Sequence, residues 1–198
     1  MAEETTIELK RAALNHYFQN LNTPQQQAVF HVNGPVLVLA GAGSGKTTAM
    51  IHRIVQMIHF GDGWVQANAS ITKEDAAYLK DYIADKQPAD LERLCSILAV
   101  QPIQPWHILA ITFTNKAANE LRNRLLQAIG EECASMLHAS TFHSACVRIL
   151  RRSISKLGYD SNFTIYDTDD SQRLMKSCIA DADVSEKQFP PRAVLTEI

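Results

Sequence analysis

The sequence lacks a long hydrophobic run, an excess of basic residues and any pair of closely spaced cysteines. Its 198 residues carry 19 Lys and Arg against 21 Asp and Glu, for a formal net charge of −2 at pH 7. Such a chain is not uniformly basic, so any grip on nucleic acid has to come from a local patch. The first ten residues hold three glutamates, and no stretch reaches the roughly 18 apolar residues of a membrane span. We therefore expect a cytoplasmic protein without a membrane segment.

The cysteines are few and dispersed. Cys95, Cys133, Cys146 and Cys178 lie far apart and include no C-x-x-C pair. That spacing argues against a zinc site and against a disulfide framework, so we expect reduced thiols in an intracellular core. Hydrophobic residues make up 46% of the chain, enough for one well-buried domain and the beginning of another.

Short apolar runs alternate with helical patterns along the chain. Residues 35–40 read P-V-L-V-L-A, which predicts a central parallel strand buried on both faces. Further strands are predicted at 108–112 and 136–140, and helices at 51–58, 115–129 and 142–157, the second of them stopped by Gly130. Strands that alternate with helices indicate an α/β fold with a layered parallel sheet.

Residues 61–105 differ from their surroundings. They open with G-D-G and close between two prolines, as an inserted segment would, and they contain two predicted helices. Thr72 is expected to cap the first helix, and the second carries an apolar stripe of Leu91, Leu94, Cys95 and Leu98. Seven acids outnumber four bases in this segment, which makes it a poor surface for DNA. We interpret it as a peripheral helical hairpin, with a site for a protein partner as the alternative.

Residues 40–47 read A-G-A-G-S-G-K-T and connect the first predicted strand to the first predicted helix. Small residues let backbone N–H groups cradle phosphates, Lys46 can reach the outer phosphates, and the Thr47 hydroxyl can bind Mg²⁺. Ala40 stands where the strict pattern has glycine, but that position needs only a small residue. The predicted site for ATP and Mg²⁺ comprises Ala40, Gly41, Ala42, Gly43, Ser44, Gly45, Lys46, Thr47 and Thr48, with Lys46 and Thr47 as catalytic residues.

A phosphate loop alone serves many chemistries, so other functions stay open at this point. One alternative is a small-molecule phosphotransferase, for which Arg151 and Arg152 are the adjacent arginine pair of a lid. Another is a non-catalytic module that binds DNA or a protein partner. The acidic strand end that orients the attacking water is not evident. The segment most similar to such a strand end is F-T-I-Y-D at 163–167, but Thr168 follows it where a glutamate is expected.

Three segments resemble known sequence elements of one family. Residues 21–29, L-N-T-P-Q-Q-Q-A-V, resemble the L-N-x-x-Q-x-x-A-V element upstream of the phosphate loop in the UvrD, PcrA and Rep group of superfamily 1 DNA helicases. Residues 111–124 and 141–152 resemble two DNA-contacting elements of these helicases. The resemblance runs from Leu21 to the end, except for 61–105, where relatives have a shorter connection. Thr48 is a second departure, because many relatives carry arginine there.

The resemblance implies roles for particular residues. Gln25 would read the adenine edge, for which an amide is suited because it donates and accepts at once. Phe113 would stack on a DNA base. The implied DNA-binding set is Phe113, Asn115, Lys116, Thr141 and His143. Residues 111–152 hold six Lys or Arg against three acids. This segment therefore supplies a local basic patch in a chain whose net charge is slightly negative.

The resemblance also implies a domain plan and an activity. Residues 1–166 would form a RecA-like ATP-binding domain 1A with helices on both faces of its sheet, interrupted at 61–105, and 167–198 would begin a helical domain 1B. The implied activity is that of a 3′-to-5′ DNA helicase on single-stranded DNA and duplex junctions. We expect the catalytic acid and the arginine fingers beyond the last residue, so this chain by itself is expected to bind ATP without being an active enzyme. The pathway, whether repair, replication or conjugation, is not encoded in these residues.

Overall fold

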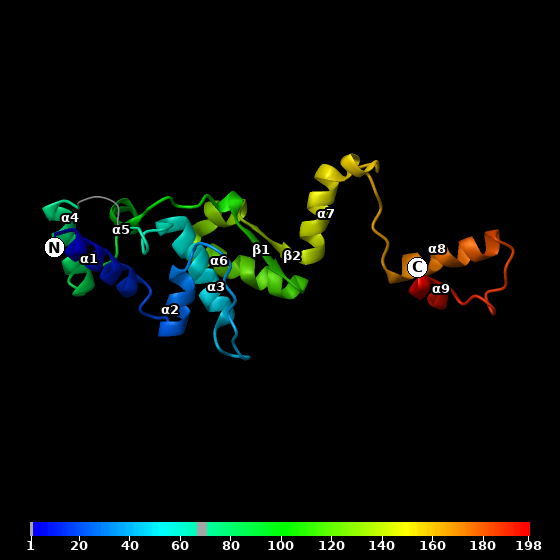
Figure 1. Cartoon of the computed structure of the whole chain (residues 1–198), viewed down its shortest axis with the longest axis horizontal. Helices are drawn as coiled ribbons and strands as arrows, with labels where there is room; N and C mark the ends of the chain where they lie inside the picture. The colour runs from blue at the N-terminus through cyan, green and yellow to red at the C-terminus, as the bar shows by residue number, and fades with distance from the viewer. Residues whose placement is uncertain (1, 67–70) are drawn as a thin grey trace. The chain divides into compact units, whose positions relative to one another are not determined.

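The computed structural model describes residues 2–66 and 71–198, and the chain divides into two compact units, Met1–Ala145 and Cys146–Ile198. The helices of the first unit are α1 (Ala2–Tyr17), α2 (Thr23–Phe30), α3 (Lys46–Val55), α4 (Lys73–Ile83), α5 (Leu91–Leu98) and α6 (Asn115–Met136) (Figure 1). Its strands are β1 (Leu109–Thr112) and β2 (His138–Thr141). The chain then continues through α7 (Phe142–Ser153), α8 (Thr168–Asp181) and α9 (Pro191–Glu197). No helix among the described residues is long and apolar enough to cross a membrane.

The two strands form a parallel pair joined by a helix. Ala110 lies opposite Ala139, and Thr112 lies opposite Thr141. Parallel strands need a crossover connection, and α6 supplies it and packs against both strands. The Arg122 side chain of α6 donates a hydrogen bond to the Ala139 carbonyl at 2.8 Å. The strands predicted at 108–112 and 136–140 are therefore confirmed with shifted bounds, at Leu109–Thr112 and His138–Thr141. They are neighbours in one sheet.

Helix α6 buries the stripe that its sequence predicts. Ala118, Leu121, Leu125 and Ile129 are its buried residues, spaced three or four apart on one face. Gly130 has a φ of 79°, which breaks the helical geometry. The helix then resumes as far as Met136. The stop predicted at Gly130 is thus a kink, because glycine permits the left-handed turn and the following residues favour helix again.

Residues 35–40 do not form the predicted buried central strand. They have no regular secondary structure, and Leu37 and Leu39 are 83% and 86% exposed. The one sheet of the described residues contains β1 and β2 alone. An apolar segment becomes a buried central strand only where strands flank it on both sides and satisfy its backbone groups. That prediction was wrong because neither β1 nor β2 pairs with this segment.

A helical lobe, made of α1, α4 and α5, contains the segment that the sequence marks as an insertion. The two helices predicted there are present, while its residues 67–70 lie outside the described part of the chain. Thr72 caps α4, since its hydroxyl accepts a hydrogen bond from the Asp75 N–H at 3.0 Å. α4 packs against α1. The largest fully buried hydrophobic side chains of this lobe and of the adjoining turn are Leu14, Phe18, Phe60, Leu79, Leu94 and Leu98.

Backbone hydrogen bonds join the two ends of the inserted segment. Gly61 forms a parallel bridge with Val100, and the Asp62 N–H donates to the Val100 carbonyl at 2.7 Å. A Cβ on Gly61, whose φ is 52°, would collide with the Val100 carbonyl oxygen, so glycine is required there. The π-helical turn Gln56–Phe60 continues α3 to this point. The lobe is therefore attached directly to the helix that follows the glycine-rich loop.

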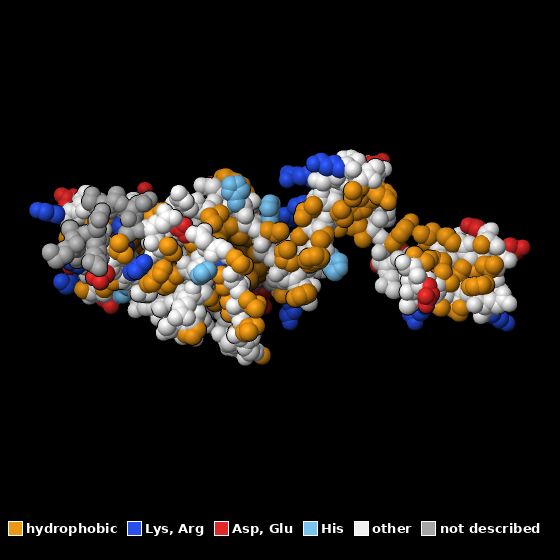
Figure 2. Space-filling model, in the orientation of Figure 1, with side chains coloured by type: hydrophobic (Ala, Val, Ile, Leu, Met, Phe, Trp, Pro, Cys, Tyr) orange, Lys and Arg blue, Asp and Glu red, His pale blue; other side chains and the backbone are white. Residues whose placement is uncertain are grey.

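The second unit has little buried surface. α8 packs against α9, and Ile179 is the one buried hydrophobic residue among those described in this unit. Hydrophobic side chains gather on the surface of this unit (Figure 2). Its exposed large hydrophobic residues include Ile149 on α7, Leu174 on α8 and Phe189 in the segment before α9. This unit therefore leaves much of its apolar surface uncovered.

The cysteines are free, but they are less buried than expected. Cys95, Cys133 and Cys146 are partly buried, and Cys178 on α8 is exposed. Burial raises the pKa of the Cys95 thiol, because a low dielectric disfavours the thiolate. The expectation of core thiols is therefore wrong for Cys178, whose position on α8 faces solvent.

Candidate functional site

The glycine-rich loop leads directly into α3, as the sequence predicts. Gly45 is the N-cap of α3 with a φ of 80°, and Gly43 has a φ of 76°. A residue with a Cβ is strained in this left-handed region, so glycine suits both positions. Lys46, Thr47 and Thr48 form the first turn of α3. The N–H groups of a first turn have no partner within the helix, and the helix dipole favours an anion beside them.

The Lys46 side chain folds back over the loop. Its Nζ donates hydrogen bonds to the carbonyl oxygens of Ala40 at 3.0 Å and Gly41 at 2.6 Å. The Ser44 hydroxyl donates to the same Gly41 carbonyl at 2.7 Å. The loop backbone thus holds a positive charge at the start of α3, beside the exposed Thr47 side chain. An ammonium, a hydroxyl and a helix N-terminus together fit a polyphosphate with Mg²⁺.

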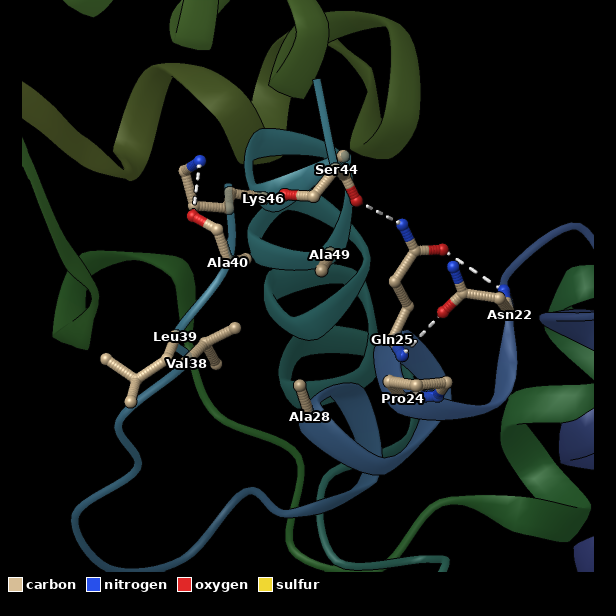
Figure 3. A pocket seen from close by; sticks show the side chains of 11 residues that line it. Asn22, Pro24, Gln25, Ala28, Val38, Leu39, Ala40, Ser44, Lys46 and Ala49 are labelled. Carbon is tan, nitrogen blue, oxygen red and sulfur yellow. Dashed lines mark hydrogen bonds between the residues drawn. The ribbon is translucent and has the colours of Figure 1, made fainter. Parts of the chain in front are cut away.

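Gln25 lies beside this loop and contacts it (Figure 3). Its Nε2 donates to the Ser44 carbonyl at 3.1 Å, and its Oε1 accepts from the Asn22 N–H at 3.1 Å. The Asn22 side chain in turn accepts from the Gln25 N–H at 3.0 Å, which completes a capping box at the start of α2. Asn22 was missed as a site residue. Its signal was in the sequence, since N-x-x-Q before an apolar run is a helix-start signature.

Arg53 ties α2 to α3 and so fixes Gln25 near the loop. Its Nη1 donates to the Ala28 carbonyl at 2.6 Å, and its Nη2 donates to the Val32 carbonyl at 3.3 Å. Burial lowers the pKa of Arg53, because the charged form loses hydration. A guanidinium nevertheless stays charged in proteins. The two charge-assisted bonds therefore hold the end of α2 against α3.

A cavity of about 300 Å³ lies between α2, α3 and the chain that precedes the loop (Figure 3). Its walls include the apolar side chains of Pro24, Ala28, Leu39 and Ala49. Gln25 and Lys46 add polar groups to the same lining. The volume is at the small end for ligand sites, and apolar walls with a few polar groups are typical of them. The cavity suits a ligand with a flat apolar part and an anionic part.

The second group of predicted residues lies where the strands end. Thr112 and Thr141 are paired as the last residues of β1 and β2, so both following segments leave the same edge of the sheet. Phe113 is 97% exposed, which excludes a core role in this chain. Asn115, Lys116 and His143 are also exposed. The sheet thus brings residues more than 25 positions apart in the sequence to one edge, which we call the strand-end edge.

Thr141 differs from the other residues of this edge. It is 7% exposed, and its hydroxyl accepts from the Ser144 N–H at 3.3 Å and lies 2.9 Å from the Ser144 hydroxyl. The hydroxyl therefore serves the start of α7 in this structure. Phe142, which the sequence patterns did not select, is 56% exposed. Only the pairing of β1 with β2 reveals that it follows the same edge as Phe113.

Asp167, the last residue of the F-T-I-Y-D run that most nearly imitates an acidic strand end, caps a helix. Residues 163–167 form no strand. The Asp167 side chain accepts from the Asp170 N–H at 2.8 Å and is the N-cap of α8. Arg151, one of the two arginines considered for a lid, lies over the Phe163 ring at 5.4 Å within the second unit. Both contacts lie within the second unit.

The A-G-A-G-S-G-K-T loop that leads into the start of α3 has the sequence of the phosphate-binding loop of P-loop proteins, although no strand precedes it in the described residues. Comparison with known sequences narrows this class. The family described as "UvrD/REP helicase N-terminal domain" matches residues 21–69 and 91–198, and this chain belongs to it. The matched residues include the loop, Gln25 and the strand-end edge. Residues 1–20 and 70–90 lie outside the match, and they contain α1 and α4.

Several relatives carry the name ATP-dependent DNA helicase PcrA. The one from Bacillus subtilis is 38% identical over 184 residues, which are 93% of this chain and 19% of the relative. Those from Staphylococcus epidermidis and Staphylococcus aureus are each 36% identical, over 185 and 187 residues, or 93% and 94% of this chain and 20% of each relative. The chain therefore spans about a fifth of the length of these relatives.

Proposed function

We propose that this chain is the ATP-binding, DNA-contacting N-terminal part of an ATP-dependent DNA helicase. The observation that carries the proposal is the loop before α3, where the Lys46 ammonium lies at a helix N-terminus beside the Gln25 cavity. The names of the relatives support the helicase class, and the family match favours it over a phosphotransferase.

In the proposed complex, the triphosphate lies against the N–H groups of residues 41–46 and the start of α3. Lys46 contacts the outer phosphates, and the Thr47 hydroxyl is the protein ligand of Mg²⁺. Bound Mg²⁺ would neutralise charge on the phosphate oxygens. Gln25 faces the adenine, with Thr48 near the base. The apolar walls of the cavity support this orientation, because a purine is flat and largely apolar on its faces.

We further propose that the strand-end edge binds single-stranded DNA. The exposed Phe113 ring supplies a stacking platform, which every base can use because each has a π-face. Lys116, Asn115 and His143 contact the sugar–phosphate backbone. Thr141 contacts the same backbone through its hydroxyl, which in this structure accepts a hydrogen bond at the start of α7. Movement in the 3′-to-5′ direction and action at duplex junctions rest on the family resemblance.

The proposed domain plan follows the same resemblance. Residues 1–166 belong to a RecA-like domain 1A, and residues 167–198 begin a domain 1B. The segment 61–105, of which the family match leaves out 70–90, is an insertion into domain 1A that forms a peripheral helical hairpin, with a surface for a protein partner as the alternative. The pairing of Gly61 with Val100 supports an insertion, because it brings the two ends of the segment close together.

The proposal is tested by asking whether the purified chain binds both Mg·ATP and a single-stranded oligonucleotide. Binding of both supports the helicase assignment, with the DNA affinity falling steeply as salt is added because phosphate contacts release counterions. Binding of ATP without DNA would favour the phosphotransferase. Binding of DNA without ATP would favour the non-catalytic module.

A further inference from the structure

Gln25 makes contacts that reading an adenine does not require. An amide that only recognises a base needs its donor and acceptor free to face the ligand. Here the Gln25 side chain is held at both ends by protein, with Oε1 on the Asn22 N–H and Nε2 on the Ser44 carbonyl, each at 3.1 Å. The second contact joins α2 to the phosphate loop across 19 residues of sequence.

The contact to Ser44 determines the orientation of one loop peptide. A peptide unit is planar and trans, so its C=O and the following N–H point in opposite directions. Because the Ser44 carbonyl points to Gln25, the Gly45 N–H points away from Gln25. Gly45 is the N-cap of α3 and directly precedes Lys46, so this peptide lies at the start of the phosphate-binding helix.

Gly45 leaves room for the Gln25 amide because it has no side chain. A Cβ built on Gly45 would lie 2.5 Å from the Gln25 Nε2, closer than real Cβ atoms approach other atoms. The absence of a side chain, together with the φ of 80°, lets the amide rest against the loop backbone. A side chain at this position would therefore displace the Gln25 amide from its contact with the loop.

We propose that Gln25 is a positioning residue of the phosphate loop as well as a reader of the base. This inference rests on the proposed nucleotide site. One N–H of the amide holds the Ser44 peptide, while the second N–H and a remaining lone pair of Oε1 are available to an adenine edge. Base recognition and the shape of the phosphate cradle then depend on one side chain. Loss of Gln25 weakens the binding of a phosphate ligand that has no base at all.

The variant that isolates this contact is Gln25→Glu. Glutamate keeps an oxygen for the Asn22 N–H, so the capping box and the start of α2 persist. It replaces the donor that faces the Ser44 carbonyl with an acceptor, which cannot make that bond. Gln25→Ala removes both contacts. Gln27→Ala is the matched control, because Gln27 is an exposed glutamine on the same helix.

The first measurement is hydrogen exchange of the peptide that covers residues 41–46, without nucleotide. Gln25→Glu and Gln25→Ala should exchange roughly two- to tenfold faster than the parent chain, the effect of one neutral hydrogen bond. The second measurement is the affinity for Mg·tripolyphosphate by calorimetry, which should fall roughly two- to tenfold in Gln25→Ala and by at least as much in Gln25→Glu, whose carboxylate also repels the phosphates. Gln27→Ala should match the parent chain in both measurements.

Two other outcomes have distinct meanings. If both Gln25 variants keep the parent's loop exchange and tripolyphosphate affinity and lose only ATP affinity, Gln25 reads the base alone and the inference is overturned. If Lys46→Ala binds tripolyphosphate as well as the parent does, the proposed nucleotide site fails. Faster loop exchange in Gln25→Glu would still show in that case that the glutamine positions the loop.

Discussion

At the scale of single residues, the charge on Lys46 is the largest contribution that one side chain of the loop can make to phosphate binding. Its Nζ already lies over the loop, held by the carbonyls of Ala40 and Gly41. Lys46→Ala should weaken ATP binding roughly 10- to 150-fold, which corresponds to the ~1.5 to 3 kcal/mol of a charge-assisted hydrogen bond. Calorimetric titration measures this loss. Lys73→Ala, which removes an exposed lysine at the start of α4, is the control and should leave the affinity unchanged.

Phe113 offers a second test at this scale, because its exposure separates binding from stability. Phe113→Ala should reduce the affinity for an oligonucleotide by ~1 to 3 kcal/mol, the contribution of stacking one base. It should change the free energy of unfolding by less than about 0.5 kcal/mol, since the ring is 97% exposed. Fluorescence anisotropy with a labelled oligonucleotide measures the binding, and urea unfolding measures the stability.

The control for Phe113 is Trp106→Ala, an exposed aromatic that precedes β1 at the opposite end of the strand. It should bind the oligonucleotide as the parent chain does. Equal loss in both variants would mean that any exposed ring contributes, and the strand-end edge would lose its special role.

At the scale of elements, the packing of α1 against α4 connects two segments that lie outside the family match. Leu79 on α4 and Leu14 on α1 are both fully buried in the same core. Leu79→Ala should lower the free energy of unfolding by ~2 to 5 kcal/mol through lost burial and a cavity. Leu91→Ala on α5 should cost much less, because Leu91 is 39% exposed.

The pair Leu14→Ala and Leu79→Ala tests whether the two helices stabilise each other. Residues that share one packed core show coupling of about 0.5 to 3 kcal/mol in a double-mutant cycle. Urea unfolding of both single variants and the double variant measures the coupling. Strict additivity would mean that α1 and α4 are stabilised independently.

His59, in the π-helical turn between α3 and the lobe, should make the free energy of unfolding depend on pH. Burial lowers the pKa of its ring from the ordinary 6.5, because the charged form is desolvated. Its buried Nε2 has no hydrogen-bond partner among the described residues. The folded chain therefore favours the neutral ring, and the unfolded chain takes up the proton first as the pH falls. The stability from the neutral ring is present above the unfolded pKa and is lost as the pH falls through the folded pKa.

His59→Gln removes this titration and should flatten the pH dependence of stability. Urea unfolding at about pH 7.5 and about pH 5.5 should show a larger loss in the parent chain than in the variant. The other histidines are common to both chains, so the difference between them reports His59. Parallel losses in the two chains would show that His59 is as easily protonated when folded as when unfolded.

At the scale of the whole molecule, the proposed nucleotide site leads to a prediction about the rate of ATP hydrolysis. In the proposed complex the loop and Lys46 stabilise bound ATP, whereas turnover also requires an acid that orients water and an arginine that stabilises the developing charge. Asp167 caps α8, and Arg151 lies over Phe163. We therefore predict that this chain binds ATP but turns it over more slowly than ~1 s⁻¹, below the usual enzyme range. Steady-state phosphate release, with and without single-stranded DNA, measures the rate. Turnover above that rate that disappears in Lys46→Ala would show a complete catalytic set.

Much of the local structure follows from the sequence, because the residues involved lie within a turn or two of each other. The buried stripe of α6, the Thr72 cap and the glycine-rich loop before α3 depend on spacings of two to four residues. The prediction of a phosphate-binding loop also comes from the sequence alone, since Gly41, Gly43, Gly45 and Lys46 lie within one short stretch. The pattern of acids and apolar residues likewise marks 61–105 as helical.

Tertiary structure decided what depends on partners distant in the chain. The apolar run at 35–40 favours a buried strand, but no strand pairs with it among the described residues and its leucines are exposed. The pairing of β1 with β2 brings Phe113 and His143 to one edge. The contact from Gln25 to the Ser44 carbonyl spans 19 residues and appears in no local pattern. Short spacings determine the preference of each segment, whereas burial and hydrogen bonding across the fold determine whether that preference is satisfied.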